Sequence, residues 1–308
     1  MGPLGFGLLG FAISLGATAA LKPLAARLGV VAPPRADRWH ARPTPLLGGA
    51  AIVLALLGCA LLLPEHPPQV LVLLGGGAAL FGLGLLDDLR PLRPATKLLA
   101  QAAVAAAVIA LGLELAPTAS PTVNALFTFV WIVGLTNAFN LLDNMDGLAA
   151  GVAAIAILFR LCFFLGEGEV VEADLAAAFL GALLGFLVFN FSPASIFLGD
   201  AGSLLIGFLV AGLSLVAESA HTRSAVSVLL LPVLLLLVPI FDTVLVTSTR
   251  ILANRAVSVG GRDHSSHRLV QLGLSEREAV GCLYLAAALG GAVAFFSRSF
   301  GISYGGVL

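Results

Sequence analysis

The sequence is poor in charged residues. Of its 308 residues only 11% are charged and 59% are hydrophobic, and the mean hydropathy is +1.05. Water-soluble domains have about 25% charged and roughly 45–50% apolar residues. The composition therefore excludes a water-soluble enzyme, a disordered chain and a nucleic-acid-binding protein. It predicts a single integral membrane domain over residues 1–308.

Cysteine is also scarce. Cys59, Cys162 and Cys282 each stand alone inside an apolar run. This spacing fits neither a disulfide framework nor a cysteine metal cluster. We interpret all three as small apolar core residues.

Long apolar runs are abundant instead. A bilayer core of about 30 Å needs roughly 17–25 apolar residues per helix. Runs this long and without alternation are not barrel strands, so the fold class expected is an all-α polytopic membrane protein with about ten transmembrane helices. The predicted spans are 4–26, 46–63, 69–86, 97–115, 123–141, 148–166, 174–191, 203–218, 225–250 and 279–297.

The few basic residues fall mainly on one side of these spans. Only Arg223 and Arg298 lie in the opposite set of loops, and Arg160 lies within a helix, from which we expect it to reach outward. The positive-inside rule places the basic loops in the cytoplasm and both termini outside. The outward loops are acidic, and include Glu172 and Asp174. The predicted cytoplasmic loops are about 27–45, 87–96, 140–147, 191–202 and 251–278.

Apart from Asp37, which lies in the first basic loop, seven aspartates lie on or near the predicted cytoplasmic side. They are Asp87, Asp88, Asp143, Asp146, Asp200, Asp242 and Asp263. Carboxylates that converge from several helices need a counter-charge, and hard oxygen ligands favour Mg²⁺ or Mn²⁺. Basic groups suited to phosphate oxygens are near in sequence, at Lys97, Arg262, His264, His267 and Arg268. Acids for a metal and bases for phosphate predict phosphoryl transfer on the cytoplasmic face.

Two other interpretations are open. The aspartates could be solvated helix caps, or they could bind coupling ions in a secondary transporter, although transporter sites usually lie near the bilayer midplane. Asp242 either pairs with a basic residue or supports the site, and a role for His40 is also open.

Five segments carry a family resemblance. They are Asp37–His40 with Thr44–Gly49; Asp87-Asp88 with Lys97 and Gln101; an Asn-x-x-Asn-x-x-Asp-x-x-Asp-Gly-Leu pattern over 137–148; Asn190-Phe191 with Phe197–Ser203; and Arg262–Leu269 leading into 272–275. The chain resembles the polyprenyl-phosphate N-acetylhexosamine-1-phosphate transferases of glycosyltransferase family 4. The resemblance runs almost from end to end.

The resemblance implies a Mg²⁺-dependent enzyme, with Mn²⁺ as an alternative metal. Such an enzyme moves a sugar 1-phosphate from a UDP-N-acetylhexosamine to undecaprenyl phosphate and releases UMP, which starts cell-wall or surface-polysaccharide synthesis. It implies a multi-pass protein of the bacterial cytoplasmic membrane whose partners are these substrates and membrane lipid, with no nucleic acid. Whether it forms a homodimer is open.

The resemblance also implies roles for individual residues. Asp87, Asp88 and Asp200 would be catalytic, and Asp200 and Asp143 would hold the metal. The substrate-binding residues would be Lys97, Asn137, Asn140, Asp143, Asp146, Asn190, His264, His267 and Arg268.

One residue departs from many relatives. Their last loop has a His-x-His-His arrangement, but here Ser266 replaces the middle histidine. The loop therefore resembles the branch that handles UDP-N-acetylglucosamine (UDP-GlcNAc) more than the phospho-N-acetylmuramoyl-pentapeptide branch, which stays as the alternative.

Overall fold

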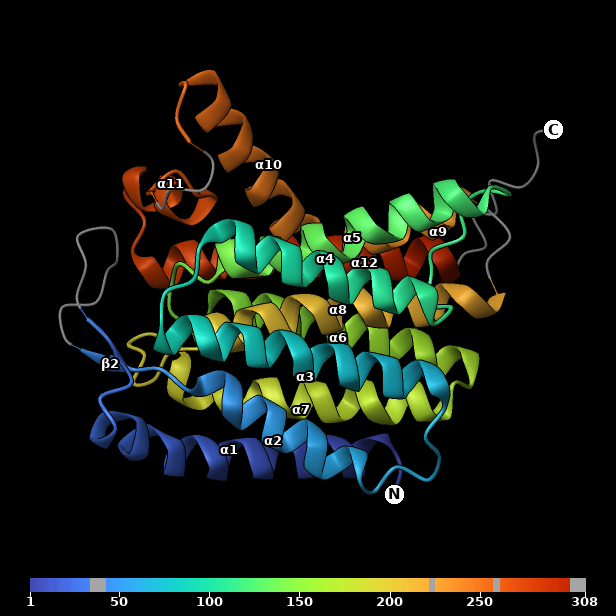
Figure 1. Ribbon diagram of the computed structural model, residues 1–308, viewed down its shortest axis with the longest axis horizontal. Helices are drawn as coiled ribbons and strands as arrows, with labels where there is room; N and C mark the ends of the chain where they lie inside the picture. The colour runs from blue at the N-terminus through green and yellow to red at the C-terminus, as the bar shows by residue number, and fades with distance from the viewer. Residues whose placement is uncertain (34–42, 222–224, 257–260, 300–308) are drawn as a thin grey trace.

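Helices make up nearly all of the regular structure. The computed structural model describes residues 1–33, 43–221, 225–256 and 261–299 (Figure 1). Two short strands, β1 (Val31–Ala32) and β2 (Thr44–Pro45), pair antiparallel, a feature the sequence did not predict. The helices are α1 (Pro3–Arg27), α2 (Gly48–Ala60), α3 (Pro68–Leu89), α4 (Pro94–Ala110), α5 (Pro121–Leu142), α6 (Leu148–Glu167), α7 (Val170–Asn190), α8 (Gly199–His221), α9 (Ala225–Leu235), α10 (Leu237–Leu252), α11 (Ser265–Gln271) and α12 (Glu276–Ser299).

Proline and glycine explain where several helices begin and end. Pro68, Pro94 and Pro121 lie in the first turns of α3, α4 and α5. The first turn has no intrahelical partner for its N–H groups, so the missing N–H of proline does no harm there. Gly168 ends α6 with a φ of 77°, a left-handed conformation that favours glycine.

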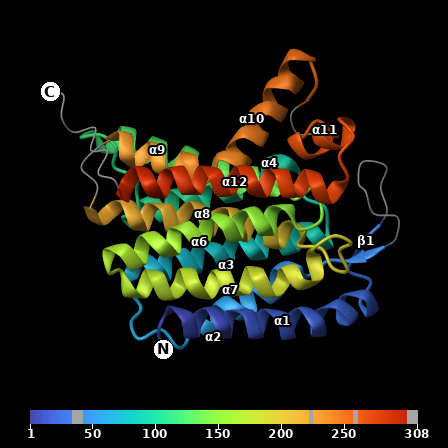
Figure 2. The same ribbon diagram turned by 180° about the vertical axis from the view of Figure 1, so that it is seen from behind.

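The helices form a bundle around α8. Among the candidate spans α8 is the most deeply buried, followed by α7 and α6, whereas α1 lies at the edge (Figures 1 and 2). Small residues let α1 and α7 approach closely, because a Cβ added at Gly10 would lie 2.4 Å from the carbonyl oxygen of Ala178.

The number of spans is only partly confirmed. Seven helices in the described part of the chain are long and apolar enough to cross a membrane, or eight if a bent pair counts as one span. Two of the ten predicted spans, 46–63 and 97–115, form the shorter apolar helices α2 and α4, with 13 and 17 residues. The all-helical membrane class is therefore confirmed at this coarser level.

The predicted span 225–250 is wrong as a single helix. It is broken at Leu236 into α9 and α10, which meet at an angle of 83°. A continuous helix would need an N–H at position 239 to bond the carbonyl of Leu235, and Pro239 has none. As a result α10 leaves the bundle (Figure 1).

Several predicted loop boundaries also differ. Asp87 and Asp88 lie inside α3, Asn140 lies inside α5, and Asp200 lies in the first turn of α8. The loop predicted over 251–278 contains α11. His40 lies outside the described residues.

Three charged side chains expected to face outward are buried. Glu172 and Asp174 lie in α7 with 7% and 0% of their surface exposed. Arg160 is 3% exposed and donates a hydrogen bond of 3.1 Å to the hydroxyl of Ser214 on α8. Arg160 therefore has a polar partner inside the bundle.

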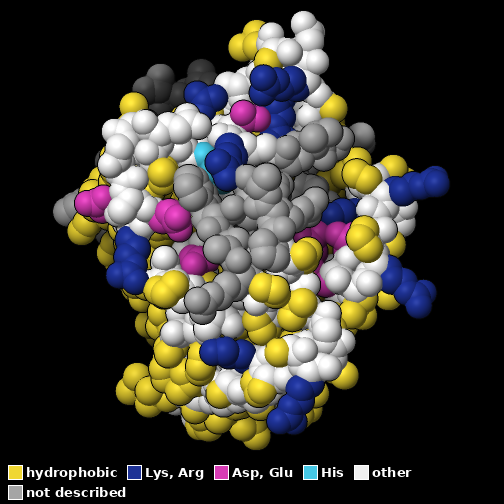
Figure 3. Space-filling view, turned by 90° about the vertical axis from the view of Figure 1, so that its left-hand side faces the viewer, with side chains coloured by type: hydrophobic (Ala, Val, Ile, Leu, Met, Phe, Trp, Pro, Cys, Tyr) yellow, Lys and Arg dark blue, Asp and Glu magenta, His cyan; other side chains and the backbone are white. Residues whose placement is uncertain are grey.

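The two ends of the bundle differ. The β1–β2 pair and α11 lie at one end, and the first residues of α1 and the last described turn of α12 lie at the other (Figures 1 and 2). The first of these ends exposes acidic, basic and histidine side chains (Figure 3). This is the end at which the loops predicted to be cytoplasmic gather, as far as the structure describes them.

Candidate active site

Asp87, Lys97 and Asp200 meet at the charged end. The Nζ of Lys97 lies 2.7 Å from Oδ2 of Asp87 and 2.9 Å from Oδ2 of Asp200, and we call this contact the Lys97 bridge. Its members come from the last turn of α3 and the first turns of α4 and α8. All three side chains are partly exposed, between 11% and 28%. The bridge therefore places two carboxylates and one ammonium group where a solute can reach them.

Asp88 caps α8. One of its carboxylate oxygens accepts the backbone N–H of Asp200 at 2.9 Å, and the other accepts that of Ala201 at 3.0 Å. These N–H groups lie in the first turn of α8 and have no partner within the helix. Gly199 begins α8 with a φ of 74°, and a Cβ there would lie 2.6 Å from Oδ2 of Asp88. Asp88, from α3, thus holds the first turn of α8, which carries Asp200.

The loop before α8 is held by two predicted site residues. Asn190 accepts the N–H of Gly147 at 3.1 Å and donates to the carbonyl of Ile196 at 3.0 Å. Asp146 accepts the N–H of Ala194 at 2.7 Å. Asp146 and Asn190 therefore position the loop that leads to Asp200.

The predicted asparagines connect α5 to its neighbours. Asn137 exchanges hydrogen bonds with Gln101 of α4. Asn140 donates to the hydroxyl of Ser203 on α8 at 2.9 Å. Asp143, the C-cap residue of α5, follows Asn140 by three positions, and Asp200 precedes Ser203 by three. Both aspartates therefore lie beyond the Asn140–Ser203 contact, at the same end of the bundle.

The segment over 262–269, which we call the histidine segment, contacts α10 and the loop after α5. Nδ1 of His264 lies 2.8 Å from Oδ2 of Asp242, and Ser265 donates its backbone N–H and its hydroxyl to Oδ1 of Asp242, both at 2.7 Å. The hydroxyl of Ser266 donates to Oδ1 of Asn144 at 2.6 Å. Asp242 therefore pairs with a predicted site residue.

His267 and Arg268 lie on α11. His267 is 2% exposed. Burial, together with the nearby His264 and Arg262, lowers the pKa of His267 to about 4, so the ring is neutral at pH 7. Arg268 donates from Nε to the carbonyl of Asp263 at 3.1 Å and is exposed.

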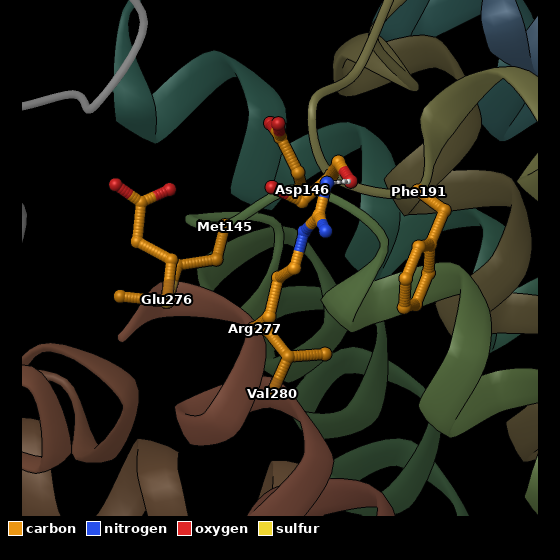
Figure 4. A pocket seen from close by; sticks show the side chains of 7 residues that line it. Met145, Asp146, Phe191, Glu276, Arg277 and Val280 are labelled. Carbon is orange, nitrogen blue, oxygen red and sulfur yellow. Dashed lines mark hydrogen bonds between the residues drawn. The ribbon is translucent and has the colours of Figure 1, made fainter. Parts of the chain in front are cut away.

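A narrow pocket lies beside Asp146 (Figure 4). Phe191 and Val280 line it, and Arg277 points across it to donate to the carbonyl of Ser192 at 2.8 Å. The pocket does not admit a water molecule. The contact between Arg277 and Ser192 shows how α12 supports the loop before α8.

Sequence reasoning missed several supporting residues. Asn144 was not predicted, and Ser266 was noted only as a departure from relatives and not as its hydrogen-bond partner. The hydroxyl of Tyr284 donates a hydrogen bond of 2.6 Å to the carbonyl of Gly147, 137 positions earlier. No local sequence pattern predicts such a contact.

Known proteins are similar to this chain along most of its length. The family model of glycosyl transferase family 4 matches residues 70–218. A "Probable undecaprenyl-phosphate N-acetylglucosaminyl 1-phosphate transferase" of Bacillus subtilis is 34% identical over 87% of this chain and 77% of its own length.

Two further relatives carry the names of the two branches, and they match different shares of the chain. The "Decaprenyl-phosphate N-acetylglucosaminephosphotransferase" of Mycobacterium tuberculosis is 34% identical over 91% of this chain and 78% of its own length. A "Phospho-N-acetylmuramoyl-pentapeptide-transferase" of Limosilactobacillus fermentum is 46% identical, but over only 30% of this chain and 29% of its own.

Proposed function

Because the chain belongs to glycosyl transferase family 4, we propose that it transfers N-acetylglucosamine 1-phosphate from UDP-GlcNAc to a polyprenyl phosphate, most simply undecaprenyl phosphate, and releases UMP. The observation that carries the proposal is the similarity along about nine tenths of the chain to relatives named for this transfer. Ser266 in the last loop supports the same branch.

The reaction is a displacement at phosphorus. An oxygen of the lipid phosphate attacks the phosphorus that carries the sugar, a new phosphorus–oxygen bond forms, and the bond to the oxygen of UMP breaks. The attacking phosphate is already a nucleophile, so the protein has to align two anions and reduce their repulsion. A single in-line step is the mechanism that we propose, and a double displacement through a phospho-aspartate is its alternative.

The Lys97 bridge suits this task. The ammonium group of Lys97 can neutralise phosphate charge, and Asp87, at 2.7 Å from it, can orient the acceptor phosphate or take up its proton. Asp88 holds the first turn of α8 and so supports Asp200. Asn137, Asn140, Asp143, Asp146 and Asn190 would surround the uridine diphosphate end, and His264, His267 and Arg268 would contact the sugar diphosphate.

The donor atoms fit a magnesium ion. In the described part of the chain, no group of three or more His, Cys, Asp or Glu side chains forms a preformed metal cluster. Mg²⁺ is usually bound by only one or two carboxylates, with water and substrate phosphates as its other ligands. Lys97 balances only one of the two carboxylates in its bridge, which leaves negative charge for a cation. Asp200 and Asp143 would hold the ion, which would screen the charge of the diphosphate and of the departing UMP.

The whole protein would lie in the bacterial cytoplasmic membrane with this site facing the cytoplasm, where UDP-sugars are made. The basic loops predicted to be cytoplasmic and the Lys97 bridge lie at the same end of the bundle.

The proposal is tested by an assay of the purified protein with undecaprenyl phosphate, Mg²⁺ and a panel of UDP-sugars. We expect UMP release from UDP-GlcNAc and none from UDP-N-acetylmuramoyl-pentapeptide. Release from the pentapeptide substrate alone would favour the other branch. Release from none of them would remove the proposed reaction and favour the transporter.

Asp200→Asn tests the metal ligand. We expect UMP release to fall by at least about 100-fold, because the charge that holds the cation is lost. Mn²⁺, used in place of Mg²⁺, should raise the unfolding temperature of the unaltered protein and not that of this variant. Glu278→Gln, an exposed change at the same end, is the matched control. Near-normal activity in Asp200→Asn would remove the metal assignment.

A further inference from the structure

Asp242 is an almost fully buried carboxylate that the proposed reaction does not use. It is 1% exposed and lies on α10, six residues after the break at Leu236. Its two oxygens accept three hydrogen bonds, one from the ring of His264 and two from Ser265. Both residues that donate these hydrogen bonds belong to the histidine segment.

This arrangement determines which nitrogen of His264 is available. An ionised carboxylate can only accept hydrogen bonds, so Nδ1 of His264, at 2.8 Å from Asp242, carries the proton. Nε2 is then the nitrogen left for another partner. A carboxylate that holds one ring nitrogen fixes both the tautomer and the direction of the ring.

The histidine segment is supported from two sides. On α10, Arg250 lies eight residues after Asp242 on the same helical face and contacts Oδ2 of Asp263 at 3.1 Å. On the other side, Ser266 donates to Asn144, which lies between Asp143 and Asp146 in the sequence. His264 is thus held between α10 and the loop that carries two proposed substrate-binding aspartates.

We propose that Asp242 is a positioning residue for the sugar-nucleotide donor: it holds the ring of His264 by Nδ1, so that Nε2 faces the donor. The proposal rests on the function proposed above. Asp242 acts through His264 and does not itself touch the substrate.

Asp242→Asn is the informative variant. The N–H of Ser265 needs an acceptor, so the amide oxygen of the new side chain takes the place of Oδ1. The amide nitrogen then faces Nδ1 of His264, which must give up its proton and accept. The ring keeps its place but presents Nε2 in the opposite hydrogen-bonding role.

Steady-state kinetics distinguish positioning from mere support. We expect the KM for UDP-GlcNAc to rise by about 10- to 100-fold, as is typical when an orienting partner is lost, and the KM for undecaprenyl phosphate to stay within about twofold. Structural damage would instead reduce the active fraction, lowering the apparent kcat with an unchanged KM. That pattern, or an unchanged KM for UDP-GlcNAc, would overturn the proposal.

Ser265→Ala is the matched control. It removes one hydrogen bond of 2.7 Å to the same carboxylate but leaves the contact between Asp242 and His264 in place. Its KM for UDP-GlcNAc should stay within about threefold of the original value. A rise equal to that of Asp242→Asn would show that general support of the segment matters, and would overturn the positioning role.

A double-mutant cycle with His264→Asn completes the test. If Asp242 acts through His264, adding Asp242→Asn to His264→Asn should raise the KM for UDP-GlcNAc no further. If the double variant instead shows a KM increase equal to the product of the two single increases, the proposal is contradicted. The unaltered protein is assayed first. If it releases no UMP, the function proposed above fails. If only the positioning role fails, the unaltered protein still releases UMP.

Discussion

At the scale of single residues, Lys97 is the central charge. Its ammonium group lies within 2.9 Å of carboxylates from two other helices. Without it, Asp87 and Asp200 would face each other as like charges, which is unfavourable at such short range. Lys97 therefore holds the ends of α3 and α8 together, and in the proposed reaction it would supply positive charge to a phosphate.

Lys97→Met should reduce UMP release by about 100-fold or more, because it removes an electrostatic contact to the reacting anions. Methionine keeps most of the apolar stem, so the bundle should stay folded. Arg93→Gln, an exposed change four residues earlier, is the control and should stay within about threefold. Full activity in Lys97→Met would contradict the proposed role.

His267 gives a pH dependence of stability. Its pKa in the folded protein is about 4, against about 6.5 in an unfolded chain. Burial, His264 and Arg262 lower this pKa, while Asp242 and Asp263 act in the opposite direction. The unfolded chain therefore binds a proton as the pH falls through 6.5, and the folded chain does not until about pH 4.

The stabilisation from a neutral His267 is complete above pH 6.5 and is lost between pH 6.5 and 4. The loss should be on the order of 2–3 kcal/mol. Unfolding midpoints measured in detergent across this range should fall less steeply for His267→Gln than for the unaltered protein. Equal slopes in the two proteins would contradict the shifted pKa.

At the scale of helices, the first turn of α8 is the element on which the site depends. Asp88 caps it, and α2 and α3 pack against it through glycines. A Cβ at Gly84 of α3 would lie 2.4 Å from the carbonyl oxygen of Asp200, and one at Gly49 of α2 would lie 2.4 Å from the backbone nitrogen of Gly202. Only glycine at these positions lets three helices meet where Asp200 emerges.

Gly84→Ala should therefore lower the unfolding temperature by several degrees, at about 1–3 kcal/mol for an overpacked contact. It should also reduce UMP release by about tenfold or more, because Asp200 moves. Gly82→Ala lies on the same helix, where a Cβ meets nothing within 4 Å, and should be neutral or slightly stabilising. If the two variants behave alike, the close packing does not position Asp200.

At the scale of the whole molecule, the charged side chains of the proposed site gather at one end of the helical bundle. The Lys97 bridge, at the ends of α3, α4 and α8, and the histidine segment lie at one end of the bundle, and the first residues of α1 lie at the other. Sugar nucleotides are polar and polyprenyl chains are apolar, so a site at the end of a membrane bundle can admit each from its own phase.

Cysteine labelling tests the proposed orientation. After replacement of the three native cysteines by alanine, a cysteine at exposed Arg93 should react with a membrane-impermeant maleimide only in opened cells. A cysteine at exposed Ala119, on the far connection between α4 and α5, should react in intact cells. The reverse labelling pattern would invert the proposed topology.

The sequence by itself determined the membrane class, most of the helices and the residues that gather at the charged end. These follow from properties that short stretches of chain possess alone: apolar length, proline at helix starts, and the local motifs around Asp87, Asp143 and Asp200. The prediction of a single helix over 225–250 was wrong, although Pro232 and Pro239 were visible, because an apolar run does not reveal whether a proline bends a helix or ends it.

Tertiary structure alone decided which side chains act on one another. Asp88 caps α8 from 112 residues away, and Asp242 holds His264 from 22 residues away. Arg160, which we expected to reach outward, is buried and donates a hydrogen bond to Ser214, 54 residues later. Hydrogen bonds of this kind depend on how helices pack, and packing depends on close contacts such as those at Gly49 and Gly84, which no local pattern encodes.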